Sequence, residues 1–143
     1  MLGKWIVRLI VFGVVVFGAL QLIPRGDALA NPPVQQEPKW DSSQTRELAQ
    51  RACFDCHSNE TNWPWYTKVQ PVSMLMSGDI SKGREMMNFS DWDQGVELTG
   101  DFVERTIRSG KMPLKRYLML HPEAKLTLEE QEQLIVGLKQ LFD

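Results

Sequence analysis

Two cysteines, Cys53 and Cys56, stand three positions apart, and His57 follows the second one directly. Residues at i, i+3 and i+4 share one face of a helix, so both thiols and the imidazole can point at one flat partner, with Phe54 and Asp55 turned away. This spacing is typical of covalent haem attachment. Each thiol bonds one vinyl group of the porphyrin, and the histidine is the proximal iron ligand. We therefore expect one haem c at this motif.

Three other uses of a cysteine pair fit less well. A thioredoxin-like redox pair belongs in a strand-rich setting, which this sequence does not suggest. A zinc site needs a second ligand pair, but the chain has no third cysteine and one further histidine, His121. A disulfide across three positions is strained and closes too small a loop to stabilise much. The adjacent histidine and the preceding export segment favour haem over all three.

Two residues could supply the second axial ligand of the iron. Met112 follows a predicted helix, and Pro113 fixes its loop, so the thioether is well suited to reach a metal. His121 could instead complete an iron with two histidines, although a hydrogen-bonded structural histidine at a helix end is the simpler interpretation. We expect Met112, with His121 as the alternative ligand and an open sixth position as the third option.

An aromatic loop follows the motif, with Trp65 and Tyr66 at its centre. Large aromatic side chains in a loop usually cover something, either a local hydrophobic cluster or a wall of the haem pocket. We expect Trp65, Tyr66 and Pro71 to line that pocket. The Pro71 carbonyl could also accept a hydrogen bond from the second ring nitrogen of His57, which haem histidines usually make.

The chain has 143 residues and a formal net charge of −2, which leaves room for one small domain after an N-terminal segment. Basic residues are spread among a similar number of acids, so no nucleic-acid surface is indicated. The part after the N-terminal segment is short enough that a protein core alone is modest, and a buried haem would enlarge that core.

The N-terminal segment is apolar, and no charged residue occurs from Leu9 to Leu20. Counted from Trp5 to Ile23, it is just long enough to cross a bilayer. We expect residues 1–30 to form a single-pass anchor in the cytoplasmic membrane. Ala28-Leu29-Ala30 resembles a signal cleavage site, so a soluble periplasmic protein is the alternative. Basic residues before the apolar run place the domain on the outer, periplasmic side.

Residues 31–39 are rich in proline and poor in apolar residues, which predicts a stiff spacer before a domain at 40–143. No stretch of that domain alternates with a period of two long enough for a strand, so the expected class is all-α. Helices are predicted ahead of the cysteines from about residue 43, from Pro71 towards Met87, from Asp101 to Arg108, and after a capping box of Thr127 and Glu130.

Side-chain patterns suggest how these helices pack. The helix after Pro71 carries an apolar stripe that runs towards Met87. The last helix has an apolar face that we expect to pack on the helix preceding the cysteines. Each face is defined by residues at helical spacing: Val72, Leu75, Met76 and Ile80 in the first case, and Leu134, Ile135, Leu138, Leu141 and Phe142 in the second.

The chain resembles the small bacterial haem-binding domain proteins, which are cytochrome c-like and follow an N-terminal membrane helix. The resemblance covers almost the whole chain and rests on these runs: Asn31-Pro32-Pro33, Cys53-Phe54-Asp55-Cys56-His57-Ser58-Asn59, Pro64-Trp65-Tyr66, Pro71-Val72-Ser73, Gly83-Arg84, Asn88-Phe89-Ser90, Lys111-Met112-Pro113-Leu114 and His121-Pro122-Glu123-Ala124. Met74 departs from the family pattern, where a tryptophan follows Pro-Val-Ser.

The resemblance implies a small cytochrome c-like helical domain around one covalent haem, with Cys53 and Cys56 as attachment points and His57 as proximal ligand. It does not decide between Met112 and His121, because both fall in matching runs. We expect a monohaem c-type cytochrome that is not an enzyme and that exchanges single electrons with a redox partner protein outside the membrane. The alternative is a binding or sensory protein for carbon monoxide or nitric oxide; peroxidase-like catalysis has less support.

Overall fold

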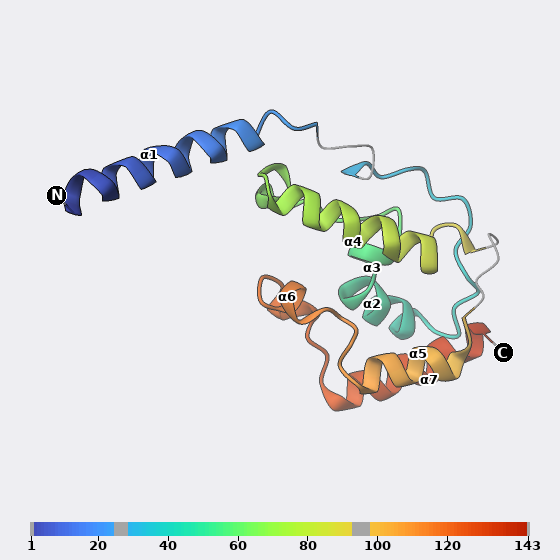
Figure 1. Ribbon diagram of the computed structural model, residues 1–143. Coiled ribbons are helices and arrows are strands. Elements are labelled where there is room, and N and C mark those ends of the chain that lie inside the picture. The colour runs from blue at the N-terminus through green and yellow to red at the C-terminus, as the bar shows by residue number, and fades with distance from the viewer. Residues whose placement is uncertain (1, 25–28, 93–97, 143) are drawn as a thin grey trace. The chain divides into compact units, whose positions relative to one another are not determined.

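A computed structural model describes residues 2–24, 29–92 and 98–142. All regular elements in these ranges are helical, and the only strand-like pairing within them is an isolated bridge between Gln36 and Asp91. The expected all-α class is therefore confirmed (Figure 1). The chain divides into two compact units, Met1–Ala30 with Trp63–Asp79 and Asn31–Asn62 with Ile80–Asp143.

The first unit contains α1 (Leu2–Leu20), the 3₁₀ helix η2 (Trp65–Lys68) and the start of α4 (Val72–Met86). Within the described residues, α1 is the one helix long and apolar enough to cross a membrane, and a signal sequence would pass the same test. The Gln21 side chain after α1 bonds the backbone of Gln70, accepting at 3.0 Å and donating at 3.2 Å. The expected cleavage site begins at Ala28, which lies outside the described residues.

The second unit holds α2 (Ser43–Ala52), α3 (Phe54–His57), the end of α4, α5 (Gly100–Arg108), α6 (Lys115–Leu118), η4 (Pro122–Ala124) and α7 (Leu128–Phe142). Local chemistry explains several boundaries. The Ser42 hydroxyl caps α2 by accepting the Thr45 N–H at 3.1 Å. Thr127 and Glu130 form the predicted capping box, with bonds of 2.8 and 3.2 Å, at the start of α7.

The core of the second unit lies between α2, α5 and α7. It includes the predicted apolar face of α7, where Leu134, Ile135 and Leu138 are buried. The prediction that this face packs on α2 is confirmed, but α5 makes the larger contact with α7. The predicted stripe on α4 is correct only in part, because Ile80 and Met87 are buried whereas Leu75 remains 63% exposed.

An aromatic cluster extends this core to the motif. Phe54 is 1% exposed, and its ring stacks on Phe89 with centroids 5.4 Å apart. Trp40 contacts both rings, at 6.2 and 5.2 Å. Phe54 lies between the two cysteines in the sequence and Cys53 also packs against this core, so the core holds the motif directly.

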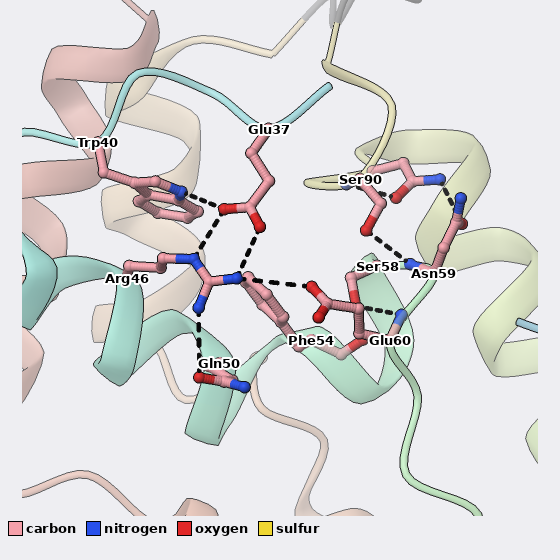
Figure 2. A network of polar contacts seen from close by, with 10 residues as sticks. Glu37, Trp40, Arg46, Gln50, Phe54, Ser58, Asn59, Glu60 and Ser90 are labelled. Carbon is pink, nitrogen blue, oxygen red and sulfur yellow. Dashed lines mark hydrogen bonds and ion pairs between the residues drawn. The ribbon is translucent and has the colours of Figure 1, made fainter. Parts of the chain in front are cut away.

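Residues 31–40, which we call the strap, include the predicted stiff spacer and form hydrogen bonds with a distant turn of the chain. The Gln35 and Gln36 N–H groups donate to the Ser90 carbonyl at 2.8 and 3.2 Å, and the Trp92 N–H donates to Gln36. Figure 2 shows the Glu37 carboxylate accepting bonds from Trp40 and Arg46. A proline-rich segment has few internal hydrogen bonds, so its backbone groups pair with the neighbouring turn, and the strap becomes part of the second unit.

Candidate functional site

The haem motif, residues 53–57, forms a single tight turn. Cys53 separates α2 from α3, and its carbonyl accepts the N–H groups of Cys56 at 3.1 Å and of His57 at 2.9 Å. Backbone hydrogen bonds thus link Cys53 to the residues three and four positions later. Cys56 and His57 lie on the short helix α3 and not, as predicted, at the end of the longer helix α2. No disulfide joins the two cysteines.

The His57 ring is oriented by α4. Its Nδ1 lies 2.9 Å from the Gly83 carbonyl oxygen and 3.1 Å from that of Met87. A carbonyl only accepts, so Nδ1 carries the proton and Nε2 keeps its lone pair for another partner. The expectation that the Pro71 carbonyl plays this role is wrong, because Gly83 in the last turn of α4 and Met87 just after it already supply two acceptors to the same nitrogen.

Burial lowers the pKa of His57, and the hydrogen bonds to the Met87 and Gly83 carbonyls oppose that shift without reversing it. The imidazole is therefore neutral at neutral pH. A neutral ring with one nitrogen bonded to a carbonyl and the other unprotonated is the form in which histidine binds metals.

Gly83 allows this arrangement because α4 passes directly against the motif. A β-carbon on Gly83 would overlap the carbonyl oxygen of Cys56 and lie 3.0 Å from its carbonyl carbon. Only glycine leaves room for so close an approach. Sequence reasoning gave Gly83 no role of its own; the available signal was a glycine near the end of a predicted helix.

Arg84 fixes the loop that follows the motif. Its Nε donates to the Ser58 carbonyl at 2.8 Å, and its Nη2 donates to the Thr61 hydroxyl at 3.0 Å and to Asn31 Oδ1 at 3.3 Å. Burial lowers the pKa of this guanidinium. Arg84 therefore connects α4, the loop and the strap. This role, like that of Gly83, was not apparent from the sequence.

Asp55 fixes the other side of the motif. Its Oδ1 accepts the Asn62 N–H at 2.8 Å, and its Oδ2 accepts the Tyr117 hydroxyl of α6 at 2.8 Å. Burial, followed by the charge of Asp55, raises the pKa of Tyr117, so the phenol stays protonated and keeps donating. Asp55 therefore joins α6 to the motif.

In the sequence, the two candidate axial ligands lie one before and one after Tyr117. Met112 is half-buried in the loop between α5 and α6, and its peptide bond to Pro113 is cis. His121 is 7% exposed, stacks on Tyr117 with centroids 4.2 Å apart, and has Nδ1 2.9 Å from Glu123 Oε1. His121 thus has the contacts of the hydrogen-bonded structural histidine that we weighed against a ligand. Met112 remains the predicted ligand.

The three expected pocket residues belong to the first unit. Trp65 is 76% exposed, and its ring meets Tyr66 edge-on with centroids 6.0 Å apart. Pro71 is exposed just before α4 and accepts the N–H groups of Met74 and Leu75. Their role in lining a haem pocket stays a prediction.

The donor set of the motif suits haem c. Two thiols and one neutral imidazole are what two vinyl groups and one iron require. Burial raises the pKa of Cys53 to about 12, so its thiol is protonated at neutral pH. In the described part of the chain, no group of three or more His, Cys, Asp or Glu residues could hold a metal ion by itself.

Comparison with known proteins agrees with this donor set. A family model described as a haem-binding domain matches residues 15–140, from the end of α1 to the last turns of α7. No curated protein and no solved structure matches the chain. The match includes the motif, the end of α4 and both candidate axial ligands.

Proposed function

The chain belongs to the haem-binding domain family, and from this premise we propose that it is a membrane-anchored monohaem c-type cytochrome. Cys53 and Cys56 hold the porphyrin through thioether bonds, and His57 binds the iron through Nε2. Met112 provides the second axial ligand, with His121 as the alternative. The protein carries single electrons to and from a partner outside the cytoplasmic membrane.

The orientation of His57 supports this proposal most directly. The carbonyls of Gly83 on α4 and of Met87 just after it hold Nδ1, so Nε2 keeps its lone pair for a metal. The ring is neutral and its tautomer is fixed before any metal arrives, which lowers the cost of ligation. Zinc fingers and thiol redox pairs do not need such a histidine next to the second cysteine.

Each part of the site then has a defined task. Haem, when bound, supplies one-electron chemistry through the ferrous and ferric states of its iron. The two thioethers fix its position, and α4 fixes the imidazole. Arg84 and Asp55 hold the flanking loop in place through bonds to Ser58 and Asn62. A site held by so many contacts reorganises little when the charge of the iron changes, which suits electron transfer.

The location is part of the proposal. The helix α1 is long and apolar enough to cross a bilayer. Basic residues precede its uncharged run, which favours a cytoplasmic N-terminus and a periplasmic haem domain. Anchoring rather than secretion is tested by fractionation: the intact chain is expected in the membrane pellet after carbonate washing, whereas a cleaved form would be soluble.

Covalent attachment is tested on the full chain made in a host that matures c-type cytochromes. The denatured protein is expected to retain the mass of one haem and a haem stain after acid-acetone extraction. Cys53→Ala and Cys56→Ala are each expected to lose one thioether, and the double variant to lose all retained haem. Ser81→Ala, an exposed change on α4, is the matched control. Complete extraction of haem from the wild type would refute covalent binding.

The carrier role has a separate test. The reduced protein is expected to be six-coordinate and low-spin and to ignore carbon monoxide, because both axial positions are filled. Rapid carbon monoxide binding by the wild type would instead favour a ligand-binding or sensory role.

A further inference from the structure

The segment 112–121 contains both candidates for the second axial ligand, and a side-chain bond in its middle reaches the motif. Tyr117 donates its hydroxyl to Asp55 Oδ2 at 2.8 Å, across a separation of 62 residues in the sequence. Asp55 lies between the two cysteines. The bond therefore joins the segment to the same short helix that carries the thioether sites.

Backbone hydrogen bonds connect Tyr117 to residues before and after it in the segment. The Tyr117 N–H donates to the Leu114 carbonyl at 2.9 Å, and the Tyr117 carbonyl accepts the His121 N–H at 3.0 Å. The Tyr117 ring also stacks on the His121 ring. Tyr117 thus lies at the centre of one compact turn, so fixing its hydroxyl fixes residues on both sides of it.

Apolar packing contributes little to holding this turn. No residue of α6 is buried, and the next two residues, Met119 and Leu120, are 82% and 61% exposed. The apolar side chains of the segment are at most half-buried, so directed polar bonds contribute much to its position. The carboxylate of Asp55 makes the bond from Tyr117 a charge-assisted one, which is the stronger kind.

We propose that Tyr117 is a positioning residue that keeps the second axial ligand on the haem iron. Its bond to Asp55 holds the 112–121 segment against the motif, so that the ligand supplied by that segment stays within reach. This inference rests on the proposed function, because it needs a haem at the motif, but it does not depend on whether Met112 or His121 is the ligand.

The test compares carbon monoxide binding to the reduced, haem-loaded full chain of wild type and Tyr117→Phe. Phenylalanine keeps the ring and its stack on His121 and removes only the hydroxyl. The variant is expected to bind carbon monoxide at least about tenfold faster, as expected for loss of roughly one charge-assisted hydrogen bond. Its oxidised form is expected to show a weakened axial-ligand charge-transfer band.

Asp55→Ala tests the same bond from its other end. It is expected to give at least a similar acceleration, because it also removes the bond from Asn62. The double variant is expected to add little to Asp55→Ala, since the bond from Tyr117 is already lost there. Glu132→Gln is the matched control, because it breaks an exposed ion pair between α7 and Arg108 of α5, away from the motif. This control is expected to leave the rate and the spectrum unchanged.

The outcomes separate the two proposals. A pigment-free wild type refutes the proposed function. A pigmented wild type that is already open to carbon monoxide refutes the positioning role, because there is then no second protein ligand to hold. Equal rates in the wild type and Tyr117→Phe also refute it. An acceleration in Tyr117→Phe without change in Glu132→Gln supports it.

Discussion

Gly83 lies against the carbonyl group of Cys56, with so little space that a β-carbon would overlap the oxygen and stand 3.0 Å from the carbon. The same glycine offers its own carbonyl oxygen to His57 Nδ1 at 2.9 Å. The close approach and the hydrogen bond are linked, because α4 can reach the imidazole only where its backbone has no side chain in the way.

Gly83→Ala is therefore expected to destabilise the protein. Alanine in a helix normally gains about 1 kcal/mol over glycine. Overlap with backbone atoms costs about 1–3 kcal/mol, and neither backbone can move aside easily. The net expectation is a loss of up to about 2 kcal/mol in the free energy of unfolding, measured by denaturant titration of the haem-loaded protein.

Gly78 is the matched control for this change. It lies on the same helix, and a β-carbon there would have nothing within 4 Å. Gly78→Ala is expected to raise the free energy of unfolding by up to about 1 kcal/mol. If both alanines stabilised the protein equally, the close contact of Gly83 with Cys56 would be wrong.

Arg84 offers a second test of how the motif is held. Arg84→Gln removes the bonds to Ser58, Thr61 and Asn31 and leaves the acceptors without this partner. Hydrogen bonds from a charged group contribute about 1.5–3 kcal/mol, so a loss of that order in the free energy of unfolding is expected. Lys82→Gln, two positions earlier and exposed, is expected to change it by less than about 0.5 kcal/mol. Similar losses in both variants would contradict the anchoring role of Arg84.

Glu37 makes stability depend on pH. The hydrogen bond from Arg46 lowers the pKa of Glu37 below its ordinary value of 4.5, although burial opposes the shift. A carboxyl whose pKa is lower in the folded state stabilises that state above pH 4.5 and loses the contribution as pH falls through the folded pKa. Glu37→Gln is therefore expected to lower the melting temperature at pH 7 and to flatten its decline in acid.

The control for this pH series is Glu47→Gln, an exposed change on α2. It is expected to keep the acid decline of the wild type. The measurement is the melting temperature of the wild type, Glu37→Gln and Glu47→Gln from neutral to acidic pH, followed by the circular dichroism of the helices. An unchanged acid decline in Glu37→Gln would mean that the bonds of the strap to Arg46 do not stabilise the fold.

The identity of the second axial ligand has its own experiment. Met112→Ala is expected to abolish any sulfur-to-iron charge-transfer band of the oxidised protein and to open the iron to carbon monoxide. Met119→Ala, at a position 82% exposed, is expected to change neither property. Retention of the band in Met112→Ala would exclude Met112 as the ligand, and His121→Gln would then be the variant expected to open the iron.

Much of the local structure could be predicted from short-range patterns. The capping box at Thr127, the N-cap before α2 and the helix from about residue 101 to Arg108 were all found where expected. These features depend on residues within one or two turns of each other, so composition and spacing are sufficient to predict them. The hydrogen bonds of the strap were not predicted, because their partners, Ser90 and Trp92, lie far along the chain.

The sequence by itself determined the chemistry of the motif: two thiols and a histidine at helical spacing, after an apolar segment. Helical spacing is a local property, so three residues were enough. Only the tertiary structure decided that Gly83 and Met87, rather than Pro71, hold the His57 ring, and that Tyr117 reaches Asp55. Those contacts join segments separated by tens of residues, and their partners are set by how whole helices pack rather than by the residues next to the motif.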